Sequence, residues 1–531
     1  MIHKAALFMR TARHLKWRQI YFRLYYRARS GFRSLRGFRY PLSLERESIP
    51  LRFPYFLSNR QSYRFGNEFT FLNVSKRFDR GIDWRFGGNG RLWSYNLNYF
   101  DFLNQEEMGR EKGLELMFDF IDNIATNRTG MEPYPLSIRT INWIKFLTRY
   151  GVRSGAMDGS LYAQALVLFN NLEYHLMGNH LLENGFALLF AGLYFNDPTL
   201  YTRARGIIMT ELDEQIMGDG AHFELSPMYH QIILFRLLDA INLLQHNTSL
   251  EQEMLGLLRG KATLMLGWLD RVTFKNGDIP LLNDSACSIA PDTGQLNAYA
   301  ARIGVKASSG RLGESGYRKV ESPGYEMVID IGNIGPDYIP GHAHNDIFSF
   351  VLNTGGKPLI VDTGVSTYEP SPMRSYQRST AAHNTVTVGG EEQSEMWGSF
   401  RVGRRAHVLN VGERENFIQA SHNGYERLGA LHTRSFEFWS DRIIINDSVG
   451  PAENHWCNAY LHFHHEARVS TEENSITANG IKIWFRGSRS IALKYYDYAP
   501  EFNMTVSAPV AVISFHKNLK TEIFVEDPFH N

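Results

Sequence analysis

Cysteine is scarce in this sequence: its 531 residues include only Cys287 and Cys457. One disulfide could not hold a chain of this length together, so the fold must depend on hydrophobic cores. No apolar run is long enough to cross a bilayer, because arginines interrupt the N-terminal runs. Gly-rich phosphate loops, low-complexity tracts and repeats of fixed period are also missing, so the sequence offers no sign of a nucleotide loop or a solenoid.

Charge is distributed unevenly along the chain. Residues 1–40 contain eleven Lys/Arg and no Asp/Glu, whereas the remaining residues contain 45 basic and 55 acidic side chains. A basic segment rich in aromatics can lie on an anionic membrane surface, or it can pack on the next domain with its arginines pointing outward. Both alternatives stay open for this arm, and we expect no nucleic acid partner.

Localisation and assembly are less well determined by the sequence. No signal-peptide core is recognisable at the start. The expected localisation is therefore cytoplasmic or membrane-associated, or periplasmic if a leader has been omitted. The oligomeric state stays open.

The hydrophobic period changes once along the chain. From about residue 113 to 272, apolar residues recur with helical spacing in seven segments separated by short polar breaks such as 196–198 and 218–220. After about residue 308, short alternating segments and turn signals are typical of antiparallel sheets. We expect three parts: an N-terminal arm with an irregular segment (1–90), a helical domain (91–308) and a β-sandwich domain (309–531).

Residues 341–385 concentrate the chemistry of the second half. His342 and His344 would project from one face of an extended strand. Asp362 follows an apolar run where a strand should end, and His383 lies 21 residues further on. His344, Asp362 and His383 could hold a zinc ion with a fourth position open. The alternative is a histidine cluster that donates only to backbone carbonyls.

Two motifs stand out in the helical half. Asn179 and His180 precede a strongly apolar helix, so they should lie at its N-terminus, where an anion is favoured. Tyr229 follows Pro227 at the start of a later helix. An aromatic and amide-rich stretch before the helices has the composition of a sugar-binding surface or of core filling; its residues are Trp93, Tyr95, Asn96, Asn98 and Tyr99.

These side chains suit β-elimination at a uronic acid. That reaction removes the C5 proton beside a carboxylate and breaks the C4–O bond, so the carboxylate charge must be neutralised while an acid and a base act. Hydrolysis would require two placed carboxylic acids. Glu183, Asp219 and Glu224 are the candidates near these motifs, and the sequence does not exclude them.

The chain resembles the heparinase II/III-like superfamily of polysaccharide lyases. The resemblance runs from about Trp93 to beyond Arg404 and is strongest in NH (179–180), SPMYH (226–230), GHAHND (341–346), IVDTG (360–364) and AAHNTV (381–386). It implies an incomplete (α/α) toroid followed by an antiparallel β-sandwich. It also implies that Asn179 neutralises the uronate, with His180 nearby, while Tyr229 and His342 act as acid and base.

The resemblance implies further contacts. His344, Asp362 and His383 would hold a structural divalent metal, expected to be zinc, that fixes the loop carrying His342. The expected substrate-binding residues are Trp93, Tyr95, Asn98, Arg139, Asn142, Glu224 and Arg378. Arg139 could equally belong to a buried ion pair.

The leading hypothesis is a lyase that acts on an acidic, uronate-containing polysaccharide such as a glycosaminoglycan. One competing hypothesis is a carbohydrate-binding or assembly protein for a surface polysaccharide. Another is a metal-dependent glycan hydrolase that activates water. The sugar, the linkage, the sulfation and the choice between endo and exo action are not determined, because they depend on loop shape.

Overall fold

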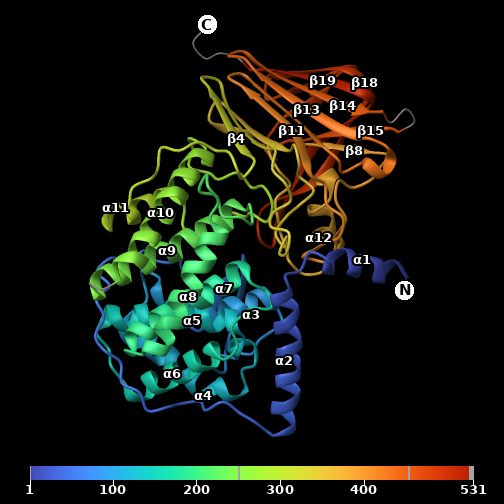
Figure 1. Ribbon diagram of the computed structural model, residues 1–531. Helices are drawn as coiled ribbons and strands as arrows, with labels where there is room; N and C mark the ends of the chain where they lie inside the picture. The colour runs from blue at the N-terminus through green and yellow to red at the C-terminus, as the bar shows by residue number, and fades with distance from the viewer. Residues whose placement is uncertain (1, 249–250, 452–454, 526–531) are drawn as a thin grey trace.

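The structure, a computed structural model, describes residues 2–248, 251–451 and 455–525. Helices form the first half and antiparallel sheets the second, as Figure 1 shows in the change from blue and green to orange and red. The last helix of the helical half, α11 (Thr293–Arg302), and the first strand of the β domain, β4 (Tyr317–Ser322), lie on either side of the expected boundary near residue 308.

The N-terminal arm consists of α1 (Ile2–Ala12) and α2 (Trp17–Leu35), and α2 runs along the side of the helical domain (Figure 1). Lys16, just before α2, is paired with Glu214 of the helical domain, whereas Arg10 of α1 donates to Glu395 of the β domain at 2.6 Å. The arm therefore packs on both domains. A small sheet of β1 (Tyr63–Arg64), β2 (Glu68–Phe71) and β3 (Val74–Arg77) follows it.

The helical domain is a stack of consecutive helices that share one apolar core. Several helices begin where the sequence supplies a proline at the first turn after an extended residue, which suits the fixed φ of proline. The helices are α3 (Arg91–Tyr99), α4 (Arg110–Asn123), α5 (Pro133–Tyr150), α6 (Gly155–Phe169), α7 (Gly178–Tyr194), α8 (Pro198–Gln215), α9 (Pro227–Asn247) and α10 (Gln252–Val272), followed by α11.

One expected helical segment, 161–177, is shorter in the structure. α6 ends at Phe169, where the side-chain amides of Asn170 and Asn171 bond back to the carbonyls of Leu166 and Val167 and compete with the backbone ladder. Residues 170–177 form a loop instead, in which Leu172, Tyr174 and Met177 are buried. Their apolar side chains still enter the core, which explains why the periodicity was misleading.

The β domain contains two main sheets. A four-stranded sheet runs in the order β4, β5 (Tyr325–Asp330), β6 (Phe350–Thr354) and β7 (Lys357–Ile360). The larger sheet contains β8 (Val386–Val388), β11 (Val408–Arg414), β12 (Phe417–His422), β13 (Leu431–Phe438), β14 (Arg442–Gly450), β15 (Cys457–His462), β16 (Val469–Thr471), β17 (Ser475–Ala478), β18 (Ile481–Glu501) and β19 (Met504–Phe524).

The two sheets enclose a second apolar core. Phe350 of β6 meets Phe436 of β13 edge to face, with ring centroids 6.1 Å apart, and Ile513 of β19 belongs to the same cluster. All strand pairs described within the sheets are antiparallel. Across the residues described, no helix combines the length and the apolar character that a bilayer crossing requires.

Candidate active site

The N-terminus of α7 brings Asn179 against a buried carboxylate. Gly178 has φ +58°, and a Cβ on it would lie 2.9 Å from Glu224 Oε1, so only glycine fits this approach easily. Asn179 donates its side-chain amide to both Glu224 oxygens, at 2.9 and 2.8 Å, and its backbone N–H to Oε1 at 3.2 Å. Glu224 was expected to contact substrate, but in the structure its carboxylate accepts hydrogen bonds from Asn179 and fixes the position of that side chain.

His180 is less buried than Asn179. Its Nδ1 lies 3.1 Å from Glu173 Oε1, and its ring packs on Tyr134 with centroids 4.6 Å apart. Burial lowers the pKa of His180, but the nearby Glu173 carboxylate outweighs this effect, so the pKa is raised above its ordinary value. A partly exposed imidazole with a raised pKa favours an anionic ligand.

Tyr229 and His342 come from different domains and stack on each other. Their ring centroids are 3.9 Å apart with planes inclined by 29°, and the Tyr229 hydroxyl lies 3.4 Å from that of Tyr368. Burial raises the pKa of Tyr229, so its hydroxyl is protonated near neutral pH. His342 keeps part of its surface exposed, and its Nε2 is 3.6 Å from Glu224 Oε2.

A buried aspartate that the sequence analysis did not select lies at the centre of the cluster. Asp284 Oδ2 is 2.9 Å from His342 Nδ1, and Asp284 Oδ1 is 2.8 Å from His344 Nε2. Arg374 pairs with both carboxylate oxygens. Burial raises the pKa of Asp284, but Arg374 and the two imidazoles together hold it well below its ordinary value.

Arg374 and Arg378 position this cluster from the short helix α12 (Pro372–Gln377) and the residue after it. Arg374 also donates to the Ser399 carbonyl at 2.9 Å. Arg378 donates twice to the Ala343 carbonyl, at 3.1 and 3.0 Å. Arg378, expected to bind substrate, is instead buried and fixes the backbone between His342 and His344.

The two histidines do not share a strand face, contrary to the expectation. Residues 341–349 form an irregular loop before β6. Asp284 orients both rings, because its two oxygens face one imidazole each. Polar partners, rather than the strand period, therefore bring His342 and His344 together.

The predicted metal ligands are placed close together but are paired differently. Asp362 Oδ2 is 2.7 Å from His383 Nδ1, and the rings of His344 and His383 have centroids 5.3 Å apart. His344 Nδ1 and His383 Nε2 are buried without a partner, which suits a metal ligand. The Asp362 carboxylate is paired with His383 Nδ1, so it does not converge with the two unpartnered imidazole nitrogens as a third metal ligand.

No three His, Cys, Asp or Glu side chains in the described chain are arranged to hold a metal. These side chains as placed do not fit a three-ligand site. Zinc stays a prediction.

Four of the expected substrate contacts lie inside the helical domain. Trp93 is core and donates to the Val74 carbonyl at 2.9 Å. Arg139 is fully buried and donates to Gln164, to the Asn98 carbonyl and to the Gly130 carbonyl. Burial lowers the pKa of Arg139 to about 9. The partners of Trp93 and Arg139 are thus protein groups, and Asn98 and Asn142 are likewise buried and hydrogen-bonded to protein groups.

Tyr95 is the exception in that stretch. It is partly exposed on α3, its hydroxyl accepts from Arg91 Nη2 at 2.8 Å, and it pairs with Glu132. Its ring lies 6.2 Å from that of Tyr99, which in turn lies 6.0 Å from Tyr134, the ring that packs on His180. A row of aromatic rings therefore connects Tyr95 to the cluster.

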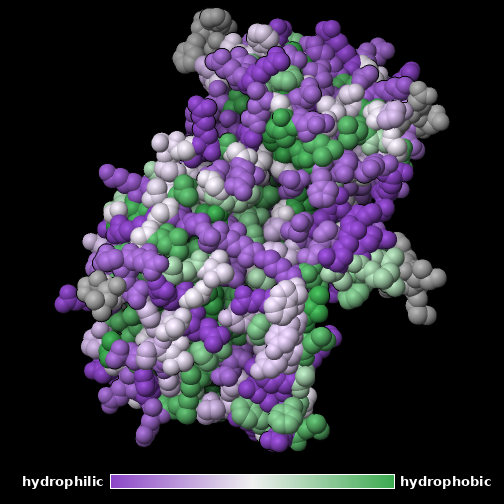
Figure 2. Space-filling view, viewed as in Figure 1, coloured by the Kyte–Doolittle hydropathy of each residue, from purple (hydrophilic) through white to green (hydrophobic). Residues whose placement is uncertain are grey.

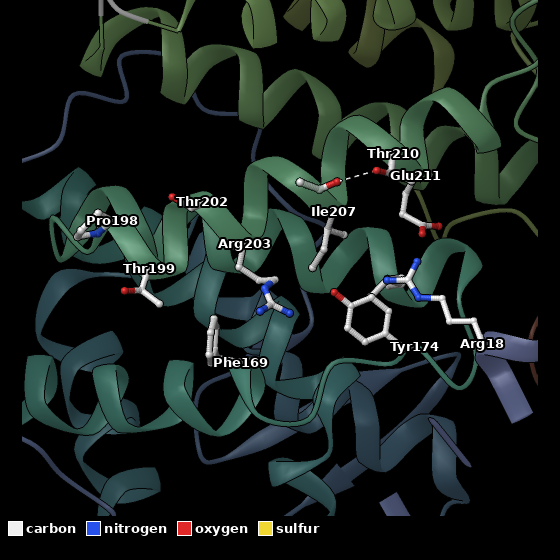
Figure 3. Close-up of a pocket in the computed structure, with 12 residues that line it drawn as sticks. Arg18, Phe169, Tyr174, Pro198, Thr199, Thr202, Arg203, Ile207, Thr210 and Glu211 are labelled. Carbon is white, nitrogen blue, oxygen red and sulfur yellow. Dashed lines mark hydrogen bonds between the residues drawn. The ribbon is translucent and has the colours of Figure 1, made fainter. Parts of the chain in front are cut away.

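A separate groove lies on the helical domain between α2, α7 and α8. It has a volume of about 620 Å³, and Figure 3 shows Arg18 close to Tyr174 and Arg203 above Phe169. The guanidinium carbons are 4.2 and 5.3 Å from the ring centroids. None of the expected catalytic residues lines this groove. The candidate active site is therefore defined by the cluster around Tyr229, His342 and Asp284, and not by this groove.

Comparisons with known proteins match both halves of the chain. The family model described as Heparinase II/III N-terminus matches residues 159–299, and the model described as Heparinase II/III-like, C-terminal, matches residues 305–526. A heparin-sulfate lyase of Bacteroides stercoris is 26% identical over 309 residues, which cover 52% of this chain and 44% of that protein. One from Pedobacter heparinus is 23% identical over 319 residues, covering 54% and 47%. The chain thus spans about half the length of the curated relatives it matches.

Solved structures share the architecture. The crystal structure of heparinase III superposes with a TM-score of 0.65 at 16% identity, covering 85% of this chain and 80% of that one. This likeness confirms the predicted fold, a helical toroid followed by a β-sandwich. Since the two family models together match most of the chain and meet at the domain boundary, the chain belongs to the heparinase II/III-like family.

Proposed function

We propose that this protein is a lyase that cleaves a uronic-acid-containing acidic polysaccharide by β-elimination. The observation that carries the proposal is the stack of Tyr229 on His342 across the two domains, beside Asn179 and the partly exposed His180. The arrangement offers a neutral phenol, an imidazole and charge-stabilising groups in one cluster. Because the relatives from Bacteroides stercoris and Pedobacter heparinus are heparin-sulfate lyases, heparin-type glycosaminoglycans are the first class to test.

His342 is the proposed base. Asp284 is ionised and accepts from His342 Nδ1, so the neutral ring keeps its unshared electron pair on Nε2. Nε2 faces Glu224 from 3.6 Å, on the side away from Asp284. A base oriented in this way removes the C5 proton without any change in its own hydrogen bond.

Tyr229 is the proposed acid. Its hydroxyl stays protonated because burial raises its pKa, and it has only a long contact with the Tyr368 hydroxyl to lose. The proton that His342 takes from C5 is matched by the proton that Tyr229 gives to O4. As the C4–O bond breaks, a C4–C5 double bond forms, and His342 then returns a proton to Tyr229 to close the cycle.

Charge neutralisation falls to His180 and Asn179. The raised pKa of His180 makes its cation available for the uronate carboxylate. Asn179 already donates its amide to Glu224, so a bound carboxylate would share this amide with Glu224 or displace it. The roles assigned here need only side chains of the chain itself.

The state of the carboxylates supports elimination over hydrolysis. A hydrolase needs one carboxylic acid that can protonate the leaving oxygen and one free carboxylate. Asp284 is held ionised by Arg374, and Glu224 is tied to the Asn179 amide. Neither is free for that task in the cluster.

Product absorbance tests the proposal directly. Elimination yields a conjugated unsaturated uronate that absorbs in the ultraviolet, whereas hydrolysis or simple binding does not. Heparan-type chains, hyaluronan, chondroitin, alginate and bacterial exopolysaccharides would be incubated with the protein and with its Tyr229→Phe variant. Absorbance that rises with the wild type and not with the variant is expected; chain shortening without absorbance would refute elimination.

A further inference from the structure

Helix α2 presents apolar side chains on two opposite faces. Its inner face packs on the loop after α6, where Phe22 stacks on Tyr174 with centroids 4.7 Å apart and the Tyr26 hydroxyl donates to the Leu172 carbonyl at 2.5 Å. Gln19 is buried on the same side and donates to the Leu176 carbonyl. The inner face of α2 therefore packs on the helical domain.

The outer face of α2 is apolar without a covering element in the described chain. Trp17 is 76% exposed, Leu24 61% and Leu35 88%, and Ile20, Tyr21 and Phe32 are also exposed. With about 100° per residue, these positions fall on one stripe opposite Phe22 and Tyr26. Figure 2 shows this region as white and green atoms over α1 and α2.

Exposed apolar side chains concentrate in this part of the molecule. Of the 23 large apolar side chains that are exposed in the described chain, twelve lie in residues 8–49. Isolated exposed apolar residues are normal, but a contiguous stripe along five turns marks an interaction surface. The stripe runs straight along the whole of α2, so a partner whose surface is flat on the scale of the helix can contact all of it.

The charges that α2 itself carries beside the stripe have one sign, while Glu211 and Glu214 of α8 lie near Arg18 and Lys16 at its start. No Asp or Glu occurs in the first 44 residues. Arg23 and Arg27 lie on one flank of the stripe, and Arg18 and Arg36 lie on the other by helical position. Arg18 also borders the groove in Figure 3, where Arg203 adds a cation and Glu211 a carboxylate. A partner with negative charge along both edges of the stripe therefore suits the arginines of α2.

We propose that the outer face of α2, comprising Trp17, Ile20, Tyr21, Leu24, Phe32 and Leu35, docks this protein on the surface of an anionic lipid bilayer. The helix would lie in the interfacial plane, with Trp17 and Tyr21 at headgroup level and the flanking arginines on acidic headgroups. A second copy of the chain fits less well, since two such faces would bring like charges together.

Vesicle co-sedimentation tests the proposal on the full-length protein. We expect binding to vesicles of phosphatidylcholine with phosphatidylglycerol at low salt, and binding weaker by about tenfold or more to phosphatidylcholine alone. The triple variant Trp17→Ser, Leu24→Ser, Leu35→Ser should lose about tenfold or more of this binding. Its unchanged melting temperature would show that it is folded, because the three side chains are exposed.

A matched control removes three exposed apolar side chains elsewhere: Phe65→Ser, Trp484→Ser and Tyr495→Ser. This variant should bind anionic vesicles like the wild type. Absence of wild-type binding at low salt, or equal losses in both triple variants, would overturn the proposal. A concentration-dependent dimer in light scattering that only the α2 variant abolishes would assign the stripe to a second copy instead, and would overturn it too.

Discussion

Replacing Asp284 by asparagine removes one negative charge from a position where one arginine and two imidazoles depend on it. The Arg374 guanidinium is buried and pairs with both oxygens, while His342 and His344 each use one oxygen. An asparagine side chain keeps nearly the same shape, but it offers one acceptor and one NH₂ group. Asp284→Asn therefore tests charge and acceptor geometry with little change in volume.

Two consequences can be estimated separately. Leaving the buried Arg374 without its carboxylate should cost about 3–5 kcal/mol of unfolding free energy. At about 2–4 °C per kcal/mol for a domain of roughly 200 residues, the melting temperature should fall by roughly 6–20 °C. An amide that donates to His342 Nδ1 would also move the ring proton to Nε2, so turnover in the folded variant should fall by about two to four orders of magnitude.

The β domain contains a matched control. Asp447 is buried, lies 2.8 Å from His432 Nε2 and accepts from Arg434 at 2.7 Å, but it is not part of the active-site cluster. Asp447→Asn should lose a similar amount of stability with turnover retained, as measured by product absorbance well below the melting temperature. Near-normal turnover in Asp284→Asn, or equal losses in both variants, would refute the role of Asp284 in orienting His342.

Four further predictions follow from single groups. Tyr229→Phe should lower turnover by about two to four orders of magnitude without changing the melting temperature; full activity would remove tyrosine from the mechanism. Burial lowers the pKa of His222 to about 4, below the ordinary 6.5. Between these two values the unfolded chain binds more protons than the folded one, so the free energy of unfolding should fall as the pH drops from 6.5 to 4. His222→Gln should reduce this pH dependence of the melting temperature. The zinc prediction is tested by elemental analysis: if His344, Asp362 and His383 rearrange around a zinc ion, His383→Ala should lose it and His342→Ala should keep it; a metal-free wild type whose melting temperature does not change with a chelator would contradict the prediction. Arg139→Lys should lower the free energy of unfolding by roughly 2–5 kcal/mol and leave KM unchanged, because the buried guanidinium donates to protein groups. A raised KM would instead indicate that Arg139 contacts the substrate.

The order of the domains and most of the helices could be predicted because they depend on local signals. α9, for example, begins with Pro227 after Ser226, whose hydroxyl accepts from the Tyr229 N–H. A cap and a proline of this kind determine where a helix starts whatever packs on it later. Tyr229 was therefore placed correctly, in the first turn of α9, from the sequence.

Buried polar residues defeated the same approach. Arg139 and Asn142 have the composition of a ligand site, but their partners come from α3, α6 and the loop before α5. A sequence cannot distinguish a polar side chain that faces a ligand from one whose partners are distant parts of the same chain. Burial had to be observed before either residue could be assigned.

Asp284 was missed for a related reason. It stands 58 residues before His342 and 90 before Arg374, in a short polar stretch with no motif of its own. The stretch 341–385 contains two arginines and three carboxylates, so its composition gave no sign that an acidic residue from outside was needed. In the structure Arg374 pairs with Asp284, whereas Arg378 donates to backbone carbonyls, and only the fold shows which arginine needs a carboxylate.

The segment around Asp284 also explains how two domains can contribute to one candidate active site. Asn283 donates to the Leu225 carbonyl, just before α9, and its side-chain oxygen accepts from the His344 N–H at 2.9 Å. The Asp284 carbonyl accepts from Ser226, while its N–H donates to the His342 carbonyl at 3.0 Å. Two consecutive residues thus contact the backbone that leads to Tyr229 and the backbone that carries His342. A shift of about 1 Å between an acid and a base can cost on the order of a hundredfold in rate. Packing within either core does not by itself set the position of one domain against the other, whereas a segment that bonds to both sides does.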